Sequence, residues 1–198
     1  RPLCAWALGA ALDSGCFDAV WAGTDDDSIE ATVKDALQGR VPVFRRGAAS
    51  CTDEASTESA LLEFAAAQDF DVLCTIQATS PLTSADDFMR ARARFMEQGA
   101  DSLLTATRTW RFFWDDAGRA LNYDPLHRPR RQDFAGTLME NGAFYFTKRP
   151  VLVEHQCRLG GRIVIHEMAP ECATEIDEPE DWAAIEAILR RRVGRDAG

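Results

Sequence analysis

Residues 71–82 read Asp-Val-Leu-Cys-Thr-Ile-Gln-Ala-Thr-Ser-Pro-Leu, and this stretch decides the fold. Its first half is mostly apolar and rich in β-branched residues, which predicts a short buried strand. Its second half is polar and contains a proline, which predicts a turn. Ser84 then begins a helix that runs to Gln98, because Asp87 follows it by three residues as in a capping box. A buried strand, a polar loop and a capped helix in this order are typical of an α/β fold.

The same alternation of strand and helix continues on both sides of this stretch. Helices are predicted over 3–14, 29–37, from the caps at 52–57 to 67, and over 178–192. Further strands are predicted over 17–23, 41–44, 102–107, 110–116, 120–123, 143–146 and 162–167. The pattern indicates one α/β domain with a largely parallel sheet.

Composition limits the class of protein. The chain has 198 residues, a formal net charge of −10 and a pI near 4.8, which argues against general nucleic-acid binding. No apolar run approaches the ~20 residues of a membrane span, so an integral membrane protein is not expected. Six cysteines without a Cys-x-x-Cys pair predict reduced thiols and an intracellular location, and no zinc site is expected.

One dense positive patch contrasts with the acidic chain. Residues 128–132 read Arg-Pro-Arg-Arg-Gln, and the planar guanidinium suits carboxylate or phosphate. The patch leads to residues 140–146, Glu-Asn-Gly-Ala-Phe-Tyr-Phe, which predict a glycine turn followed by a short aromatic strand. From these residues alone, a ligand site and a solvated loop or nuclear-localisation signal both stay open.

Three polar segments lie next to predicted elements. Residues 24–27 and 77–82 each follow a predicted strand, and residues 175–177 precede the last helix. Ligands of open α/β sheets bind where such loops leave the carboxyl ends of strands. Glu175 and Asp177 either hold one Mg²⁺ or begin the last helix. There is no Gly-x-Ser-x-Gly motif and no Gly-rich phosphate loop. A basic cluster, a polar loop and a carboxylate pair suit metal-assisted transfer between anionic partners.

Taken together, these segments resemble the CMP-N-acylneuraminate synthetases, the cytidylyltransferases that activate sialic acids, and especially the animal-type enzymes. The matching segments fall in the family's order: Pro2-Leu3 with Trp6, 10–13, 17–25, 76–81, 128–133, 140–146, 160–161 and 176–177. The run Arg-Pro-Arg-Arg-Gln-Asp followed by Glu-Asn-Gly-x-Phe-Tyr-Phe is the specific part. The resemblance implies a Rossmann-like nucleotidyltransferase fold for residues 1–198 as a single domain, with about 108–135 as a dimerisation extension.

The resemblance implies transfer of CMP from CTP to the anomeric hydroxyl of a sialic acid, with release of pyrophosphate and with Mg²⁺ as cofactor. Carried over residue by residue, the sugar site comprises Gln77, Thr79, Ser80, Arg108, Arg131, Gln132, Asn141, Gly142 and Tyr145. The nucleotide would meet Asp25, Arg46, Ser56 and Thr57. Glu175 and Asp177 would ligate Mg²⁺, and the catalytic residues would be Asp177 and Arg131.

The resemblance also implies a homodimer or a dimer of dimers, in which an extension reaches over the partner's active site. The aromatic residues of 110–126 would supply contact area for it. An animal-type enzyme would be nuclear, and any other would be cytoplasmic.

Two departures from the family keep alternatives open. Residue 175 is Glu where the family usually has Asp, and the family's first strand and Gly-Ser-Lys phosphate loop would precede Arg1. We therefore expect the natural chain to continue upstream. The alternatives are a 3-deoxy-octulosonate cytidylyltransferase and a catalytically inactive sugar- or nucleotide-binding domain that lacks the phosphate loop.

Overall fold

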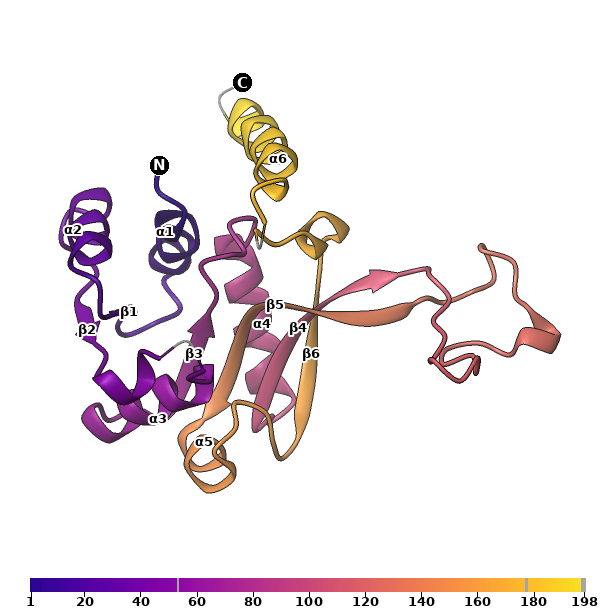
Figure 1. Ribbon diagram of the computed structural model, residues 1–198, viewed down its shortest axis with the longest axis horizontal. Helices are drawn as coiled ribbons and strands as arrows, with labels where there is room; N and C mark the ends of the chain where they lie inside the picture. The colour runs from indigo at the N-terminus through magenta and orange to yellow at the C-terminus, as the bar shows by residue number, and fades with distance from the viewer. Residues whose placement is uncertain (53, 177, 197–198) are drawn as a thin grey trace.

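The computed structural model describes residues 1–52, 54–176 and 178–196, with only the backbone for 193–196. Two sheets form within this part (Figure 1). The smaller sheet pairs β1 (Ala22–Thr24) with β2 (Val43–Arg45) in parallel. The larger sheet has the order β3-β5-β4-β6, made of β3 (Val72–Ile76), β5 (Thr137–Lys148), β4 (Ser102–Thr109) and β6 (Ile163–Met168).

The larger sheet is mixed, with one reversed strand. β5 runs antiparallel to both β3 and β4, while β6 runs parallel to β4. Three of its four strands therefore point the same way, which confirms the prediction of a mostly parallel α/β sheet. Their carboxyl ends lie at one edge, where the predicted ligand loops begin.

Six α-helices are described. They are α1 (Cys4–Ser14), α2 (Asp27–Ala36), α3 (Thr57–Ala67), α4 (Ala85–Glu97), α5 (Arg149–His155) and α6 (Asp181–Asp196). Ser84 and Asp87 form the expected capping box at the start of α4. Gly15 ends α1 with φ +60°, a left-handed conformation that glycine adopts without steric cost. The predicted helices are confirmed, whereas α5 was not predicted.

The main core lies between α4 and the larger sheet. Phe88 of α4 contacts Phe144 of β5 with ring centroids 4.6 Å apart, and Phe95 contacts Phe146 at 5.7 Å. Because side chains alternate along a strand, Tyr145 faces the opposite side of the sheet from these two phenylalanines. Segments near α3 and α5 lie on that side of the sheet, and these two helices contact each other.

The strand predicted at 17–23 is wrong for most of its length, because β1 begins only at Ala22. Phe17 instead packs its ring against Phe88, at 5.4 Å between centroids, and adds to the core without joining a strand ladder. The prediction of a buried strand at 71–76 is confirmed in position. Val72 is nevertheless 39% exposed, since β3 pairs only with β5 among the described strands.

The predicted glycine turn at 140–142 is also wrong, because Gly142 lies inside the long strand β5. The pairing of β4 with β5 jumps from Leu104–Tyr145 to Ala106–Glu140, which marks an irregularity where β5 carries extra residues. Gly142 has φ +64° there, and such bulges bend a strand and aim side chains. The apolar pattern at 143–146 predicted only the half of β5 that is buried.

Residues 110–136, here called the arm, extend away from the body of the molecule between β4 and β5 (Figure 1). The strands predicted at 110–116 and 120–123 do not form, and a single bridge joins Trp114 to Ala120. The arm is held by rings instead: Phe112 stacks on Tyr123 at 4.1 Å, and Arg128 lies 4.5 Å over Phe112. Within the described residues, no helix is long and apolar enough to cross a membrane.

Candidate functional site

The polar loop after β3 and the carboxylate segment near residue 175 lie side by side. The amide of Gln77 donates to the carbonyl of Ala143, which continues the β3–β5 ladder, at 3.0 Å. The amide of Ile176 donates to the carbonyl of Thr79 at 2.9 Å. These two bonds bring segments from three regions of the sequence to the carboxyl end of β3.

Gly142 and Glu175 are in close contact at this edge. A Cβ atom on Gly142 would lie 2.7 Å from Oε1 of Glu175, closer than real Cβ atoms approach an oxygen. The positive φ of Gly142 adds a second reason for glycine at this position. The bulge in β5 therefore makes room for a carboxylate next to the polar loop.

Tyr145 forms a wall of the same site. It is registered opposite Thr75, and Gln77 shares the face of Thr75 by the two-residue period of a strand. The Tyr145 side chain is buried, and its hydroxyl donates to Oε1 of Glu140 at 2.5 Å. Burial and the nearby Glu140 carboxylate raise the pKa of the phenol well above its usual range. The phenol is therefore neutral at physiological pH, and its one proton is donated to Glu140.

Four buried oxygen atoms near this edge have no hydrogen-bond partner within the described part of the chain. They are Thr75 Oγ1, Ser80 Oγ, Thr107 Oγ1 and Asn141 Oδ1. The other side of the Asn141 amide is engaged, since Nδ2 donates to the carbonyl of Cys172 at 2.8 Å. Buried polar atoms are nearly always satisfied by protein, water or ligand, so these atoms mark a polar interior directly beneath the edge.

Thr75 and Glu140 were not predicted as site residues. Thr75 lies two residues before Gln77, so the alternation of side chains along a strand could have indicated that both belong to one face. Nothing in the sequence pattern could have indicated Glu140, because only the bulge brings it to the hydroxyl of Tyr145.

The predicted nucleotide residues fall into two places. Arg46 follows β2 and donates from Nη2 to Oδ1 of Asp25 at 2.8 Å, which holds the pKa of the Asp25 carboxyl below its usual range. Ser56 accepts a hydrogen bond from the amide of Ser59, and Thr57 is the first residue of α3. The structure thus joins Arg46 to Asp25, and places Ser56 and Thr57 at a helix N-terminus, where anions are stabilised.

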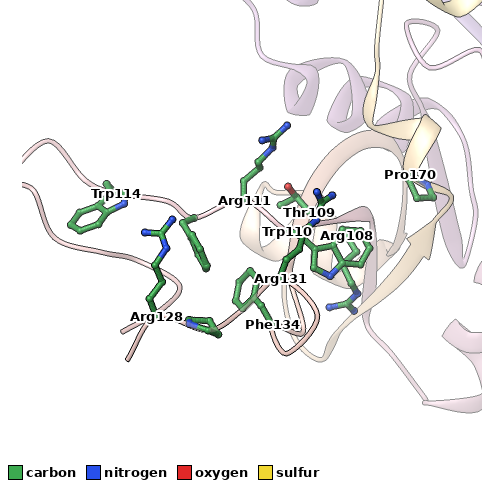
Figure 2. A pocket seen from close by; sticks show the side chains of 11 residues that line it. Arg108, Thr109, Trp110, Arg111, Trp114, Arg128, Arg131, Phe134 and Pro170 are labelled. Atoms are coloured by element: carbon green, nitrogen blue, oxygen red, sulfur yellow. The ribbon is translucent and has the colours of Figure 1, made fainter. Parts of the chain in front are cut away.

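Of the two predicted sugar-site arginines, Arg108 belongs to β4 just before the arm, and Arg131 lies on the arm. Arg108 forms a two-point ion pair with Glu167, with Nη2 and Oε2 2.6 Å apart. Arg131 and Gln132 line an open hollow of about 400 Å³ with Trp110. A neighbouring hollow of about 750 Å³ is lined by arginines and aromatic side chains of the arm (Figure 2). Among the described residues, no hydrogen bond or ion pair joins Arg131 to Gln77 or Tyr145.

The metal prediction is only partly covered by the structure. Asp177 lies outside the described residues, and within the described ones no group of three His, Cys, Asp or Glu side chains could hold a metal ion. Glu175 places a hard oxygen ligand at the site edge. Mg²⁺ in phosphate-transfer sites is bound by one or two carboxylates with waters and substrate phosphates, so this donor fits.

Comparisons with known proteins point to one family. Residues 1–187 match the family model described as cytidylyltransferase. N-acylneuraminate cytidylyltransferase A of Danio rerio is 36% identical over 198 residues, which cover 96% of this chain and 45% of that protein. The N-acylneuraminate cytidylyltransferase of Oncorhynchus mykiss is 37% identical with the same coverage. The resemblance to the animal enzymes is confirmed, and the chain spans less than half the length of these relatives.

A more distant relative and two solved structures extend the comparison. Pseudaminic acid cytidylyltransferase of Campylobacter jejuni is 28% identical over 158 residues, covering 74% of this chain and 67% of that protein. The structure of 4-diphosphocytidyl-2C-methyl-D-erythritol synthase from Anaerococcus prevotii has a TM-score of 0.69 at 13% identity, covering 96% and 86% of the two chains. CMP:2-keto-3-deoxy-manno-octonic acid synthetase complexed with CTP has a TM-score of 0.67 at 16% identity, covering 97% and 89%.

These two structural neighbours confirm the α/β nucleotidyltransferase fold. The family model covers both the polar loop after β3 and the Glu175 segment that contacts it. The chain therefore belongs to the cytidylyltransferase family.

Proposed function

We propose that the chain transfers CMP from CTP to a sialic acid or a related nonulosonate and releases pyrophosphate. The proposal rests on one observation. The polar loop after β3 is joined through Thr79 to the segment that contains Glu175, and this junction lies beside Tyr145. This junction places neutral hydrogen-bond donors and a carboxylate around one edge, as a hydroxyl nucleophile and a triphosphate require. The similarity to N-acylneuraminate cytidylyltransferases supports this acceptor class.

In this proposal, the chain's own residues mainly bind and orient. The side-chain amide of Gln77 donates to the acceptor sugar, and the Tyr145 hydroxyl, whose own proton goes to Glu140, accepts from a sugar hydroxyl. Arg46 exchanges its ion pair with Asp25 for contact with the nucleotide. Such positioning supplies a large share of the rate in group transfer between two bound substrates.

Mg²⁺ is the proposed cofactor, with Glu175 and Asp177 as its protein ligands. When bound, Mg²⁺ would neutralise charge on the triphosphate. Glu175 is brought to the edge by Gly142, whose missing Cβ leaves room for the carboxylate. The longer side chain of Glu compared with Asp is accommodated by the glycine at this contact.

The arm suggests that the acceptor site is completed by a second copy of the chain. Arg131 is exposed and lies on the arm, which extends away from the body (Figure 1). Its guanidinium suits the carboxylate of a sugar acid, yet no contact joins it to Gln77 or Tyr145 among the described residues. In the proposed homodimer, Arg131 and Gln132 of one protomer would bind the acceptor held by the other.

The proposal is tested by pyrophosphate release from CTP with Mg²⁺ and either N-acetylneuraminate or 3-deoxy-octulosonate. We expect release with N-acetylneuraminate and little with the octulosonate. Faster release with the octulosonate would favour the alternative acceptor. Calorimetry on the same protein adds a second result: binding of sugar acid or CTP without pyrophosphate release would contradict transfer and leave a binding domain.

A further inference from the structure

Arg158 lies in the segment between α5 and β6, outside the site residues described above. Its side chain is only 18% exposed, and arginines are rarely buried so far unless their charge is paired. Its Nε donates to Oε1 of Glu58 at 2.7 Å, and Glu58 belongs to the first turn of α3. The ion pair therefore connects α3 with the segment after α5.

The same guanidinium lies over the ring of Tyr145, with its central carbon 4.9 Å from the ring centroid. The hydroxyl of that ring donates to Glu140. Tyr145 is thus held at its face by Arg158 and at its hydroxyl by Glu140. Two contacts of this kind fix both the plane of the ring and the direction of its hydroxyl.

The backbone of Arg158 is held independently of its side chain. Its carbonyl oxygen accepts a hydrogen bond from Oγ1 of Thr147 at 2.6 Å. Thr147 is two residues after Tyr145 in β5, so this bond docks the segment directly on the strand. Substitution of the Arg158 side chain therefore removes the ring contact while the segment stays in place.

We propose that Arg158 is a positioning residue for the acceptor pocket, which rests on the proposed function. Anchored to Glu58, its planar guanidinium lies over Tyr145 and keeps the hydroxyl directed at Glu140. A lysine at this position could still pair with Glu58, but it has no planar face to stack on the ring. The role therefore depends on arginine and is more specific than an ion pair between two segments.

The contact is tested in the free protein by NMR with ring-labelled tyrosine. The chain has two tyrosines, so Tyr123 on the arm serves as an internal reference. We expect Arg158→Lys and Arg158→Ala to shift the ring signals of Tyr145 and leave those of Tyr123 unchanged. Glu58→Gln should shift the Tyr145 signals in the same direction by less. Unchanged Tyr145 signals in a folded Arg158→Ala protein would overturn the contact.

A matched control is Arg190→Ala, which removes an exposed ion pair with Glu186 on α6. It should move neither tyrosine. Any shift of Tyr145 in this control equal to that in Arg158→Ala would show a nonspecific effect and contradict the proposal.

Calorimetry then tests the role in binding. Arg158→Ala should weaken N-acetylneuraminate binding by about tenfold, the scale of a desolvated cation–π contact, with CTP affinity unchanged within about twofold. Arg158→Lys should not fully restore sugar-acid affinity. Equal losses for both ligands, or unchanged sugar-acid affinity, would overturn the role. If the unsubstituted chain binds no sugar acid, the proposed function and the pocket role both fail, whereas the ring signals still decide the contact.

Discussion

The amide of Ile176 donates to the carbonyl of Thr79 at 2.9 Å, and this hydrogen bond joins two segments far apart in the sequence. It holds Glu175 next to the polar loop that follows β3. Neither segment alone distinguishes a ligand site from an ordinary turn or helix start. Their junction is the observation on which the proposed transferase site rests.

Gly142→Ala should impair Mg²⁺-dependent activity more than its effect on stability explains. The new Cβ would lie 2.7 Å from Glu175 Oε1 and must displace this carboxylate. Gly39→Ala is a matched control, because Gly39 has φ +69° with nothing within 4 Å. Both substitutions should lower the free energy of unfolding by about 1–2 kcal/mol, the cost of a left-handed residue with a side chain.

The two glycine variants are compared by urea unfolding and by the Mg²⁺ concentration that gives half-maximal turnover. We expect only Gly142→Ala to need more Mg²⁺. The same Mg²⁺ dependence in both variants would contradict a metal role for Glu175.

Asp87→Asn should destabilise the protein in a pH-dependent way. Burial alone would raise the pKa of Asp87, but hydrogen bonds from His166 and Ser84 outweigh it and lower the pKa to about 2 from the ordinary 3.8. The ionised form is thus favoured by folding, and its contribution of roughly 2 kcal/mol is present above pH 4 and lost as the pH falls from about 4 to 2. Urea unfolding of both proteins at pH 7, 5 and 3.5 measures the difference.

Asp86→Asn is the control for this series. Among the described residues, Asp86 pairs only with Arg90, at 3.2 Å on an exposed face of α4, where ion pairs contribute at most about 1 kcal/mol. A difference between wild type and Asp87→Asn that stays constant from pH 7 to 3.5 would show that the carboxylate charge is not responsible.

Arg131→Ala should weaken sugar-acid binding by roughly 1.5–3 kcal/mol, the scale of a lost charged hydrogen bond, and leave CTP affinity nearly unchanged. Equal damage to both ligands would indicate that the arginine cluster is a solvated loop with no acceptor role. Calorimetry with each ligand separately measures the two affinities.

A mixing experiment tests whether Arg131 acts on a second copy of the chain. Arg131→Ala and Gln77→Ala proteins are each expected to be poorly active, but each retains the part that the other lacks. In an equal mixture of exchanging dimers, about a quarter of all sites would be intact, because half of the dimers are mixed and each has one complete site. Activity equal to the mean of the two separate proteins, or a monomer in sedimentation, would contradict the shared site.

Much of the body of the fold could be predicted, since its signals are local. Caps such as Ser84 with Asp87 mark helix starts through bonds made within one turn. The strand at 71–76 combines apolar content with flanking turns. The rest depends on contacts that the sequence does not show. An apolar residue is needed at position 17 because the ring of Phe17 packs on Phe88, and a glycine is needed at position 142 because Glu175 lies close to it across the bulge.

The arm shows the same limit. Its aromatic residues resemble strand residues, yet they stack on each other and on Arg128 instead of pairing in a sheet. For the site, the sequence predicted Gln77, Thr79, Gly142, Tyr145 and Glu175, which the structure brings to one edge. The sequence could not indicate that Arg131 lies on an arm directed away from them, because direction is a property of the folded β4–β5 pair.

The most direct test of the account is the rate at which the protein forms CMP-N-acetylneuraminate from CTP and N-acetylneuraminate, compared with Gln77→Ala and Gln98→Ala. Gln98 follows the far end of α4 and shares no hydrogen bond with the site among the described residues. We predict product with the unsubstituted chain and with Gln98→Ala, and a strongly reduced rate with Gln77→Ala that comes from weaker sugar-acid binding. Equal rates for the two glutamine variants would contradict the acceptor site at the end of β3, and no product with any protein would contradict the transfer of CMP.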